Sequence, residues 1–455
     1  MAKIHKFLKL KGSKVKYDVV VVGGGTAGYS TAIALARHGK KVMVIEKDRF
    51  GGVCVNYGCV PSVFVHLVSK ALTRVPSDLG YLGLQAVVEA DRYYRRMAET
   101  RDYLAEAGRK LVENSGADVE LGEAEVSGPS AVRVNDREYE FERLVLATGS
   151  VPKPLNIPGG ERALSEDQAF LIKDPPSSMV VIGGGYAGVE IAQAFGKLGT
   201  QVTLITRSRI LERLQLSEET RKVLLDSLSF DNVEVKEFTE PKRIDESGKV
   251  ETTRGEFKGE VVVAAVGRRP CYPRGLEKLG VETDVDGVKV NDRMETSNPR
   301  VLAVGDVVSK GFRLANAALM EGLTVAANLA LSLDLRVDYS YIPQVVFSDP
   351  NIGVVGRKDL AVKFLFYPNG ATTRSIVEGK REGHVVLGLD SGGRIVYGET
   401  VGENAEAVVN ALALAIKLKA KVEDLAFVPF VHPSMMEALS NAARAFYNFD
   451  VDQYK

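Results

Sequence analysis

The run Gly23-Gly24-Gly25-Thr26-Ala27-Gly28 lies between a short apolar segment and an alanine-rich segment. The apolar segment, residues 17–22, predicts a buried parallel strand, and the alanine-rich segment predicts a helix that ends near His38. A second strand is expected over residues 41–45 and leads into Glu46. In this order of elements, the glycines let backbone N–H groups approach a pyrophosphate, and the acidic side chain is placed to accept hydrogen bonds from a ribose hydroxyl. The stretch therefore predicts a dinucleotide-binding unit.

The same pattern begins again 160 residues later. Residues 179–182 predict a strand, and Gly183-Gly184-Gly185-Tyr186-Ala187-Gly188 repeats the turn. A helix is expected to about Leu198, followed by a strand over residues 201–205. The chain is therefore expected to contain two dinucleotide-binding units.

The two units differ just after their second strands. Where the first unit has Glu46, the second has Thr206, followed closely by Arg207 and Arg209. A carboxylate would repel a 2′-phosphate, whereas arginines can pair with one. The second unit therefore favours NADPH over NADH. The alternative is that both arginines are solvated loop charges that contact no ligand.

Two of the three cysteines lie in one glycine-flanked stretch, Gly51-Gly52-Val53-Cys54-Val55-Asn56-Tyr57-Gly58-Cys59-Val60-Pro61-Ser62. Two thiols this close in sequence can form a small disulfide ring and reopen it. A helical pattern follows from Val63, so Cys59 is expected just before or within the first turn of a helix. The positive end of a helix favours thiolate over thiol. The stretch therefore predicts a redox-active pair.

The composition excludes several classes of protein. The 455 residues carry 59 basic and 59 acidic side chains, so the overall charge indicates no nucleic-acid partner. Three cysteines exclude a disulfide scaffold and fit a reducing compartment, which favours the cytoplasm. No run approaches about 18 uninterrupted apolar residues, so no membrane span is expected. Six lysines in residues 1–16 indicate a solvated basic tail or, alternatively, a segment that attaches to an anionic partner.

Three further strands are expected to lead into short glycine turns. One ends at Thr148-Gly149-Ser150, ahead of a proline-rich connector that indicates a domain crossover. Residues 261–266 end at Gly267, and residues 301–304 end at Gly305-Asp306. A lone Gly-Asp pair is by itself more often only a turn.

The composition changes after about residue 341. A helix over residues 405–420 follows four strand-like segments, which predicts a separate α+β module without a nucleotide turn. The strands are expected over residues 344–347, 352–355, 385–389 and 395–399. Near the end of the chain, Pro433 suits the first position of a helix, so His432 is expected at its mouth with Glu437 about one turn inside. A lone histidine is more often structural than catalytic.

Taken in order, these features resemble the FAD-dependent pyridine nucleotide–disulfide oxidoreductases, a family that includes dihydrolipoamide dehydrogenase, glutathione reductase and mercuric reductase. The resemblance covers nearly all of residues 17–455. It implies an α/β fold with two Rossmann-like dinucleotide-binding domains and a C-terminal α+β dimerisation domain. The implied boundaries are a basic tail over 1–16, an FAD-binding domain over 17–150 and 271–340, an NAD(P)-binding domain over 151–270 and a dimerisation domain over 341–455.

The resemblance also implies roles for individual residues. The positions that match the FAD site are Gly23, Gly25, Gly28, Glu46, Gly149, Gly305 and Asp306. The positions that match the nicotinamide-nucleotide pyrophosphate site are Gly183, Gly185 and Gly188, with Tyr186 matching the residue that gates the nicotinamide pocket. The remaining cofactor-binding candidates are Glu190, Arg207, Arg209 and Gly267. No metal site is implied.

The catalytic positions follow from the same resemblance. Cys59 matches the flavin-side thiol, and Cys54 matches the thiol that exchanges with a small disulfide or dithiol substrate. His432, held by Glu437, matches the acid/base, which in this family reaches the disulfide of the other subunit of a homodimer. The third cysteine, Cys271, is interpreted as structural.

The chain departs from the family pattern at Val63, where relatives have a lysine that pairs beside the flavin with the glutamate matching Glu190. Without that cation, the pKa of Glu190 is expected to rise, and a shifted flavin potential follows. The alternative is that another cation substitutes. The chain also resembles mercuric reductase in residues 202–208 and 442–446, but residues 450–455 contain no cysteine pair and His432 stands where that enzyme tends to have tyrosine.

Three hypotheses remain for the activity. The first is an NAD(P)H–disulfide oxidoreductase similar to dihydrolipoamide dehydrogenase. The second is a metal-ion reductase that lacks terminal cysteines. The third is a flavin- and nucleotide-binding carrier or scaffold with impaired disulfide chemistry, which the cysteine pair and His432 disfavour. Residues 62–120 contain no charge cluster that identifies the substrate.

Overall fold

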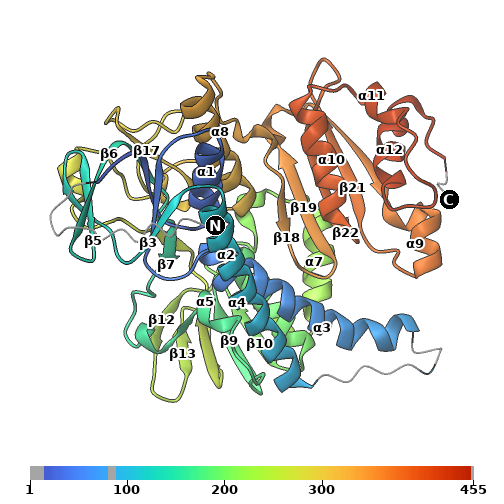
Figure 1. Ribbon diagram of the computed structural model, residues 1–455. Helices are drawn as coiled ribbons and strands as arrows, with labels where there is room; N and C mark the ends of the chain where they lie inside the picture. The colour runs from blue at the N-terminus through green and yellow to red at the C-terminus, as the bar shows by residue number, and fades with distance from the viewer. Residues whose placement is uncertain (1–14, 80–82, 84–88, 452–455) are drawn as a thin grey trace. The chain divides into compact units, whose positions relative to one another are not determined.

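The computed structural model describes residues 15–79, 83 and 89–451 (Figure 1). The predicted basic tail, apart from Val15 and Lys16, lies outside the described residues. The chain forms two compact units. The first comprises Met1–Asn56, Glu99–Val151 and Arg269–Val337, and the second comprises Tyr57–Ala98, Pro152–Arg268 and Asp338–Lys455.

The first unit is built on a sheet in the order β3-β2-β1-β6-β5-β4, in which β17 also pairs with β6. Its strands are β1 (Val15–Val22), β2 (Val42–Glu46), β3 (Asp118–Leu121), β4 (Glu125–Gly128), β5 (Ala131–Val134), β6 (Arg137–Leu146) and β17 (Val301–Ala303). The pairs β1–β2, β2–β3, β1–β6 and β6–β17 are parallel. Buried parallel strands require apolar residues on both faces, and residues 19–22 and 42–45 meet that requirement.

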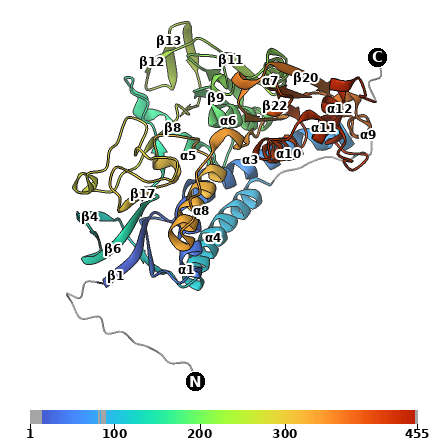
Figure 2. The ribbon, with the colours of Figure 1, turned by 90° about the horizontal axis from the view of Figure 1, so that it is seen from above.

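Two helices of this unit, α1 (Thr26–Arg37) and α8 (Ala315–Leu331), pack side by side (Figures 1 and 2). The crossing is close because Gly322 has no side chain: a Cβ there would lie 2.6 Å from the carbonyl oxygen of Ala27 and 2.7 Å from the hydroxyl of Thr31. The packing fixes the turn that precedes α1.

The second unit contains a parallel sheet in the order β11-β10-β9-β15-β8. Its strands are β8 (Leu164–Ser165), β9 (Ser178–Ile182), β10 (Gln201–Ile205), β11 (Val233–Lys236) and β15 (Val261–Ala264). A small antiparallel sheet joins β12 (Pro241–Ile244), β13 (Lys249–Thr252) and β14 (Gly255–Lys258). The helices of this part are α5 (Glu166–Ala169), α6 (Tyr186–Lys197) and α7 (Glu218–Phe230).

The same unit contains an antiparallel sheet in the order β18-β19-β22-β21-β20. Its strands are β18 (Gln344–Val346), β19 (Asn351–Gly356), β20 (Lys363–Pro368), β21 (His384–Leu389) and β22 (Ile395–Gly402). Helix α10 (Ala405–Lys417) packs on β19 and β22, and α12 (Glu437–Arg444) packs on β20 and β21. Two shorter helices, α9 (Thr373–Glu378) and α11 (Val422–Ala426), complete this part. Three of the four predicted strands are confirmed within one residue, and the fourth, β22, extends three residues beyond the predicted end at 399; β20 is an edge strand that was not predicted from the sequence.

The cysteine stretch forms two helices, α2 (Gly52–Asn56) and α3 (Cys59–Leu79), and α4 (Ala90–Asn114) follows. In the described part of the chain, one helical stretch, Gly52–Val75, is long and apolar enough to cross a bilayer by length and composition alone. A core helix of a soluble protein passes the same test, so the expectation of no membrane span stays a prediction.

Candidate active site

The first glycine turn is a cradle that tolerates no side chains at two of its positions. Gly23 has a φ of +111°, and a Cβ there would collide with the carbonyl oxygen of Ala147. A Cβ at Gly28 would collide with the carbonyl oxygen of Gly23. Gly25 caps α1, whose first turn has no acidic residue. Exposed N–H groups at a helix N-terminus without a competing carboxylate fit the pyrophosphate of FAD.

The second glycine turn repeats this geometry. Gly183 has a φ of +122° and a Cβ there would collide with the carbonyl oxygen of Ala265, while a Cβ at Gly188 would collide with that of Gly183. Gly185 faces open space within 4 Å. Ala147 and Ala265 face the first glycine of their turns in the same way. Gly149 and Gly267 follow these alanines and both have positive φ values, +70° and +93°, so the structural repeat extends to these two glycines.

Glu46 lies at the end of β2, as predicted, but its carboxylate also holds the glycine turn. Oε2 accepts a hydrogen bond from the N–H of Gly24 at 2.6 Å, and Oε1 accepts one from Asp48 at 2.8 Å. Burial raises the pKa of Glu46, while the two N–H donors oppose that shift. Each carboxylate oxygen has further acceptor capacity, so a ribose hydroxyl fits the site.

The equivalent place in the second unit is occupied by buried Thr206, whose side chain packs on Gly184. Arg207 is exposed and forms no ion pair with any residue that the structure describes. Arg209, in contrast, pairs with Glu218 at the start of α7. Of the two predicted phosphate-binding arginines, Arg207 is therefore the one that no described carboxylate neutralises.

Helix α2, which carries Cys54, is attached to the first glycine turn. Gly51 donates its N–H to the carbonyl oxygen of Gly24 at 2.9 Å, and a Cβ at Gly52 would lie 2.9 Å from Cα of Gly25. Asn56, which the sequence analysis did not select, closes the helix by donating Nδ2 to the carbonyl oxygen of Phe50 at 3.0 Å. The turn predicted to bind FAD therefore also positions Cys54.

Cys59 is the first residue of α3, as the sequence predicts, and it is exposed. Backbone N–H groups in the first turn of a helix favour a thiolate at this position.

Asp306 and its neighbour Gly305 are held by two buried partners. Ser150 donates its hydroxyl to Oδ2 of Asp306 at 2.6 Å, and Gly305 donates its N–H to Oε2 of Glu321 at 2.6 Å. Glu321 is 1% exposed within the apolar helix α8. Glu321 was not predicted from the sequence, although an acidic residue in a run as apolar as Ala315–Leu331 is a signal for a buried hydrogen-bond acceptor.

Glu190 has two hydrogen-bond donors. Its carboxylate accepts hydrogen bonds from the Ser62 hydroxyl and from the N–H of Phe347, both at 3.0 Å. Burial raises the pKa of Glu190 to about 6, although both hydrogen bonds act against that shift, and no cation contributes among the described residues. The expectation of a raised pKa is confirmed. Val63 is 48% exposed.

Replacing Glu190 by glutamine is expected to change how stability depends on pH. The folded carboxyl keeps its proton up to about pH 6, whereas an unfolded one releases it near pH 4.3, so ionising Glu190 costs folded-state free energy. The cost develops as the pH rises through this window and persists above it. Glu190→Gln is therefore expected to gain about 1–2 kcal/mol relative to the native protein between pH 4 and pH 8.

Urea unfolding at several pH values tests this expectation, and a stability difference that does not vary with pH would contradict it. Val63→Lys is the second variant: a lysine there that pairs with Glu190, as the family resemblance implies, lowers the pKa of Glu190 and moves the window to lower pH.

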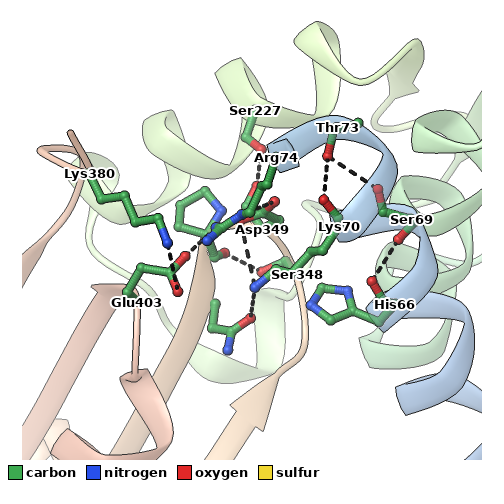
Figure 3. Close-up of polar contacts among 12 residues, drawn as sticks. His66, Ser69, Lys70, Thr73, Arg74, Ser227, Ser348, Asp349, Lys380 and Glu403 are labelled. Carbon is green, nitrogen blue, oxygen red and sulfur yellow. Dashed lines mark hydrogen bonds and ion pairs between the residues drawn. The ribbon is translucent and has the colours of Figure 1, made fainter. Parts of the chain in front are cut away.

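Asp349 lies at the centre of a buried ion-pair network that joins α3, α6 and the segment after β18. Figure 3 shows the part of this network that involves Lys70 and Arg74 of α3. Arg74 pairs with Asp349 and with Glu403, and Lys197 lies 2.9 Å from Asp349 and 3.2 Å from Asp231. Burial alone would raise the pKa of Asp349, but the Arg74 hydrogen bonds and the Lys70 and Lys197 charges hold it well below its usual range. The network fixes the helix that begins at Cys59.

Asp349→Asn is expected to destabilise the protein by about 3–5 kcal/mol at pH 7, because it leaves buried cations without their carboxylate. A depressed pKa contributes stability that is present above the unfolded value, about 3.9, and is lost as the pH falls further. The difference between the two proteins should therefore shrink below pH 4. Urea unfolding measures it, with Asp226→Asn in the exposed Lys222–Asp226 pair as the control. Equal stability of both variants at pH 7 would contradict the assignment.

The structure corrects the prediction for the end of the chain. Helix α12 begins at Glu437, so Pro433 precedes the helix, and Glu437 is its first residue instead of lying about one turn inside it. The reason is that the Glu437 carboxylate organises the preceding turn: Oε1 bonds Nδ1 of His432 at 2.9 Å, and Oε2 accepts the N–H of Ser434 at 2.9 Å. The side chain of His432 is 64% exposed, which leaves Nε2 available to a ligand.

The glycine cradles, the cysteine pair and the α+β module define a flavoprotein of the nucleotide-dependent redox class. The family described as pyridine nucleotide-disulphide oxidoreductase matches residues 17–322, and its dimerisation domain matches residues 342–443. The chain belongs to this family. The chain is an FAD-dependent NAD(P)H–disulfide oxidoreductase, and members of this family use FAD and NAD(P)H.

Full-length relatives support this assignment. The chain is 33% identical to the dihydrolipoyl dehydrogenase of Thermus scotoductus, covering 95% of this chain and 97% of that one. It is 31% identical to the mercuric reductase of Lysinibacillus sphaericus, covering 96% and 84%. The solved structure of LpdA from Mycobacterium tuberculosis shares the fold, with a TM-score of 0.85, 24% identity and coverage of 95% and 99%.

Proposed function

We propose that this protein passes electrons between NAD(P)H and a small disulfide or dithiol, and that dihydrolipoamide is the substrate class. The observation that carries the proposal is the His432–Glu437 pair, because Glu437 orients Nδ1 and leaves an exposed Nε2 for proton transfer. A scaffold protein has no use for such a pair. Dihydrolipoyl dehydrogenases of several organisms are among its full-length relatives.

Each side chain then has a defined task. The thiolate of Cys54 attacks one sulfur of the substrate disulfide and releases the first thiol, which takes a proton from Nε2 of His432. Cys59 attacks Cys54 in the resulting mixed disulfide, re-forms the Cys54–Cys59 disulfide and releases the second thiol. Oxidation of a dithiol runs these steps in reverse. Bound FAD supplies two-electron exchange between the cysteine pair and the nicotinamide.

The site assignments complete the proposal. The glycine cradle at 23–28 with Glu46, Gly149, Gly305 and Asp306 binds FAD, and the cradle at 183–188 with Gly267 binds the nicotinamide nucleotide, while Tyr186 covers the nicotinamide pocket. The predicted domain boundaries stand as part of this proposal. Two chains form a homodimer through residues 341–455, so that His432 serves the disulfide of the other subunit. A reducing cytoplasm is the location proposed for such a thiol pair.

Arg207 is expected to set the preference for NADPH. Its guanidinium is exposed, whereas Arg209 is already paired with Glu218. Arg207→Ala is therefore expected to weaken the binding of 2′,5′-ADP about tenfold while leaving 5′-ADP unchanged, because only the former has a 2′-phosphate. Calorimetry with both nucleotides tests this. A 2′,5′-ADP affinity no higher than that of 5′-ADP in the native protein would assign the site to NADH.

Turnover with a panel of substrates tests the proposed function. The native holoenzyme is expected to act on dihydrolipoamide with the oxidised nicotinamide and on lipoamide with the reduced one, and His432→Gln should lose both activities. Turnover of Hg(II) that exceeds turnover of every disulfide and dithiol would instead support the metal-ion reductase. Absence of turnover with all of them would support the carrier or scaffold.

A further inference from the structure

One face of α6 is polar, and four of its side chains bond to a single segment, residues 344–349. These side chains are Tyr186, Glu190, Gln193 and Lys197. Residues with these spacings lie along one face of a helix. The contacts therefore form a ladder between α6 and the start of the C-terminal sheet.

Two of the four side chains bond the backbone of the segment, and a third bonds the side chain of Asp349. Glu190 accepts the N–H of Phe347 at 3.0 Å. Gln193 donates to the carbonyl oxygen of Asp349 and accepts its N–H, both at 2.8 Å. Lys197 holds the carboxylate of the same aspartate at 2.9 Å. At the other end, Gln344 lies in β18 and pairs with Val354 of β19. Gln344 is thus an anchored group.

The fourth contact is different, because it joins two uncharged side chains. The Tyr186 hydroxyl donates to Oε1 of Gln344 at 2.7 Å. Burial raises the pKa of Tyr186, so the phenol stays protonated and acts as the donor. Tyr186 is the first residue of α6, directly after the open cradle position Gly185. Its ring can change rotamer without disturbing the contacts made by the later residues of α6.

We propose that Gln344 is a positioning residue that holds Tyr186 in the closed position over the nicotinamide pocket, so that the ring moves aside only when this hydrogen bond breaks. The inference rests on the proposed function, in which Tyr186 gates that pocket. A ligand that binds only when the ring is in the open position has an apparent affinity equal to its intrinsic affinity multiplied by the fraction of open molecules. Removing the hydrogen bond raises that fraction, and a net hydrogen bond of ordinary strength corresponds to about a two- to tenfold change.

Calorimetry on the oxidised holoenzyme tests the proposal with two ligands. NADP+ contains the nicotinamide that requires the open gate, and 2′,5′-ADP lacks it. Gln344→Leu is expected to lower the Kd for NADP+ about two- to tenfold and to leave the Kd for 2′,5′-ADP unchanged. Gln344→Glu retains an acceptor for the phenol, so its Kd for NADP+ should be no lower than that of the native protein. NAD+ and 5′-ADP replace this pair if the native protein binds them more tightly.

The hydrogen bond between Tyr186 and Gln344 is here called the latch, and the Tyr186 ring over the nicotinamide pocket is called the gate. The variant Tyr186→Phe helps to distinguish failure of the latch from failure of the gate. Tyr186→Phe should lower the Kd for NADP+ like Gln344→Leu, and the double variant should bind no more tightly than the tighter single variant. If Tyr186→Phe changes the Kd but Gln344→Leu does not, the latch is wrong and the gate stands. If neither changes it, the latch is wrong, and Tyr186→Ala, which removes the ring, tests the gate: an unchanged Kd for NADP+ in that variant would show that Tyr186 does not gate the pocket. Equal changes for both ligands would overturn the latch, because the effect would not depend on the nicotinamide.

Discussion

Replacing Cys59 by serine is expected to abolish disulfide turnover, with a loss on the order of 10⁴-fold or more, as for removal of other enzymatic nucleophiles. A serine hydroxyl at the N-terminus of α3 cannot form the disulfide with Cys54 and does not ionise near neutral pH. Cys54→Ser is expected to have an equally large effect. Steady-state reduction of lipoamide, with FAD content measured for each variant, checks both.

The control for this prediction is Cys271→Ser. The Cys271 thiol lies 3.7 Å from Nζ of Lys47, and its backbone oxygen accepts the Thr148 hydroxyl, so a serine there should fold and retain native turnover. Both active-site variants should still bleach the flavin with NADPH, because the glycine cradles are intact. Turnover within tenfold of the native value in Cys59→Ser would contradict the assignment of the pair.

Replacing His432 by glutamine is expected to lower turnover about 10²- to 10⁴-fold, the range for loss of a general acid or base. Glutamine can still bond Glu437 but cannot exchange a proton near neutral pH. Glu437→Gln should have a smaller effect. The two carboxylate oxygens of Glu437 bond His432 and Ser434, one each, and the amide of glutamine keeps one oxygen acceptor and therefore one of these two bonds. Comparing kcat with KM separates proton transfer from substrate binding.

His38→Gln is the control, because His38 is also exposed and its ring, among the residues that the structure describes, bonds the carbonyl oxygen of Ala34 near the end of α1 and no carboxylate. Its turnover should be native. If His432→Gln retained native turnover across pH 6–9, His432 would not be the acid/base. A mixture of inactive His432→Gln chains with inactive Cys59→Ser chains would further show whether the two groups act across a dimer, because a mixed dimer regains turnover only if they do.

The sequence predicted the repeated units well, because their signals are local. The turns at 23–28 and 183–188 require glycine for steric reasons that the structure shows as backbone collisions, so the pattern and the geometry have the same cause. The strands that flank the turns are buried and continuously apolar, which makes them readable without a partner sequence. β20 was missed because an edge strand that contains Lys363 and ends at Pro368 lacks that signal.

The site was predictable only in part. Glu46 follows a strand at a fixed spacing, and its position was confirmed. The contacts of Glu190 with Ser62, of Asp349 with Arg74 and of Gln344 with Tyr186 span 128, 275 and 158 residues of sequence, so no local pattern indicates them. The turn at His432 was mispredicted because Pro433 was placed at the first position of a helix, where proline is common. In the structure the helix begins at Glu437, and the Glu437 side chain makes the hydrogen bond to His432.

Thiol mapping after anaerobic reduction tests directly whether Cys54 and Cys59 form a disulfide that the nicotinamide reduces. The oxidised holoenzyme is alkylated before and after one equivalent of NADPH, or of NADH if that is the tighter ligand, and the labelled cysteines are identified by mass spectrometry. Cys54 and Cys59 should be labelled only after reduction, while Cys271 is labelled equally in both samples and serves as the reference. Flavin bleaching with identical labelling of Cys54 and Cys59 before and after the nicotinamide would contradict the account.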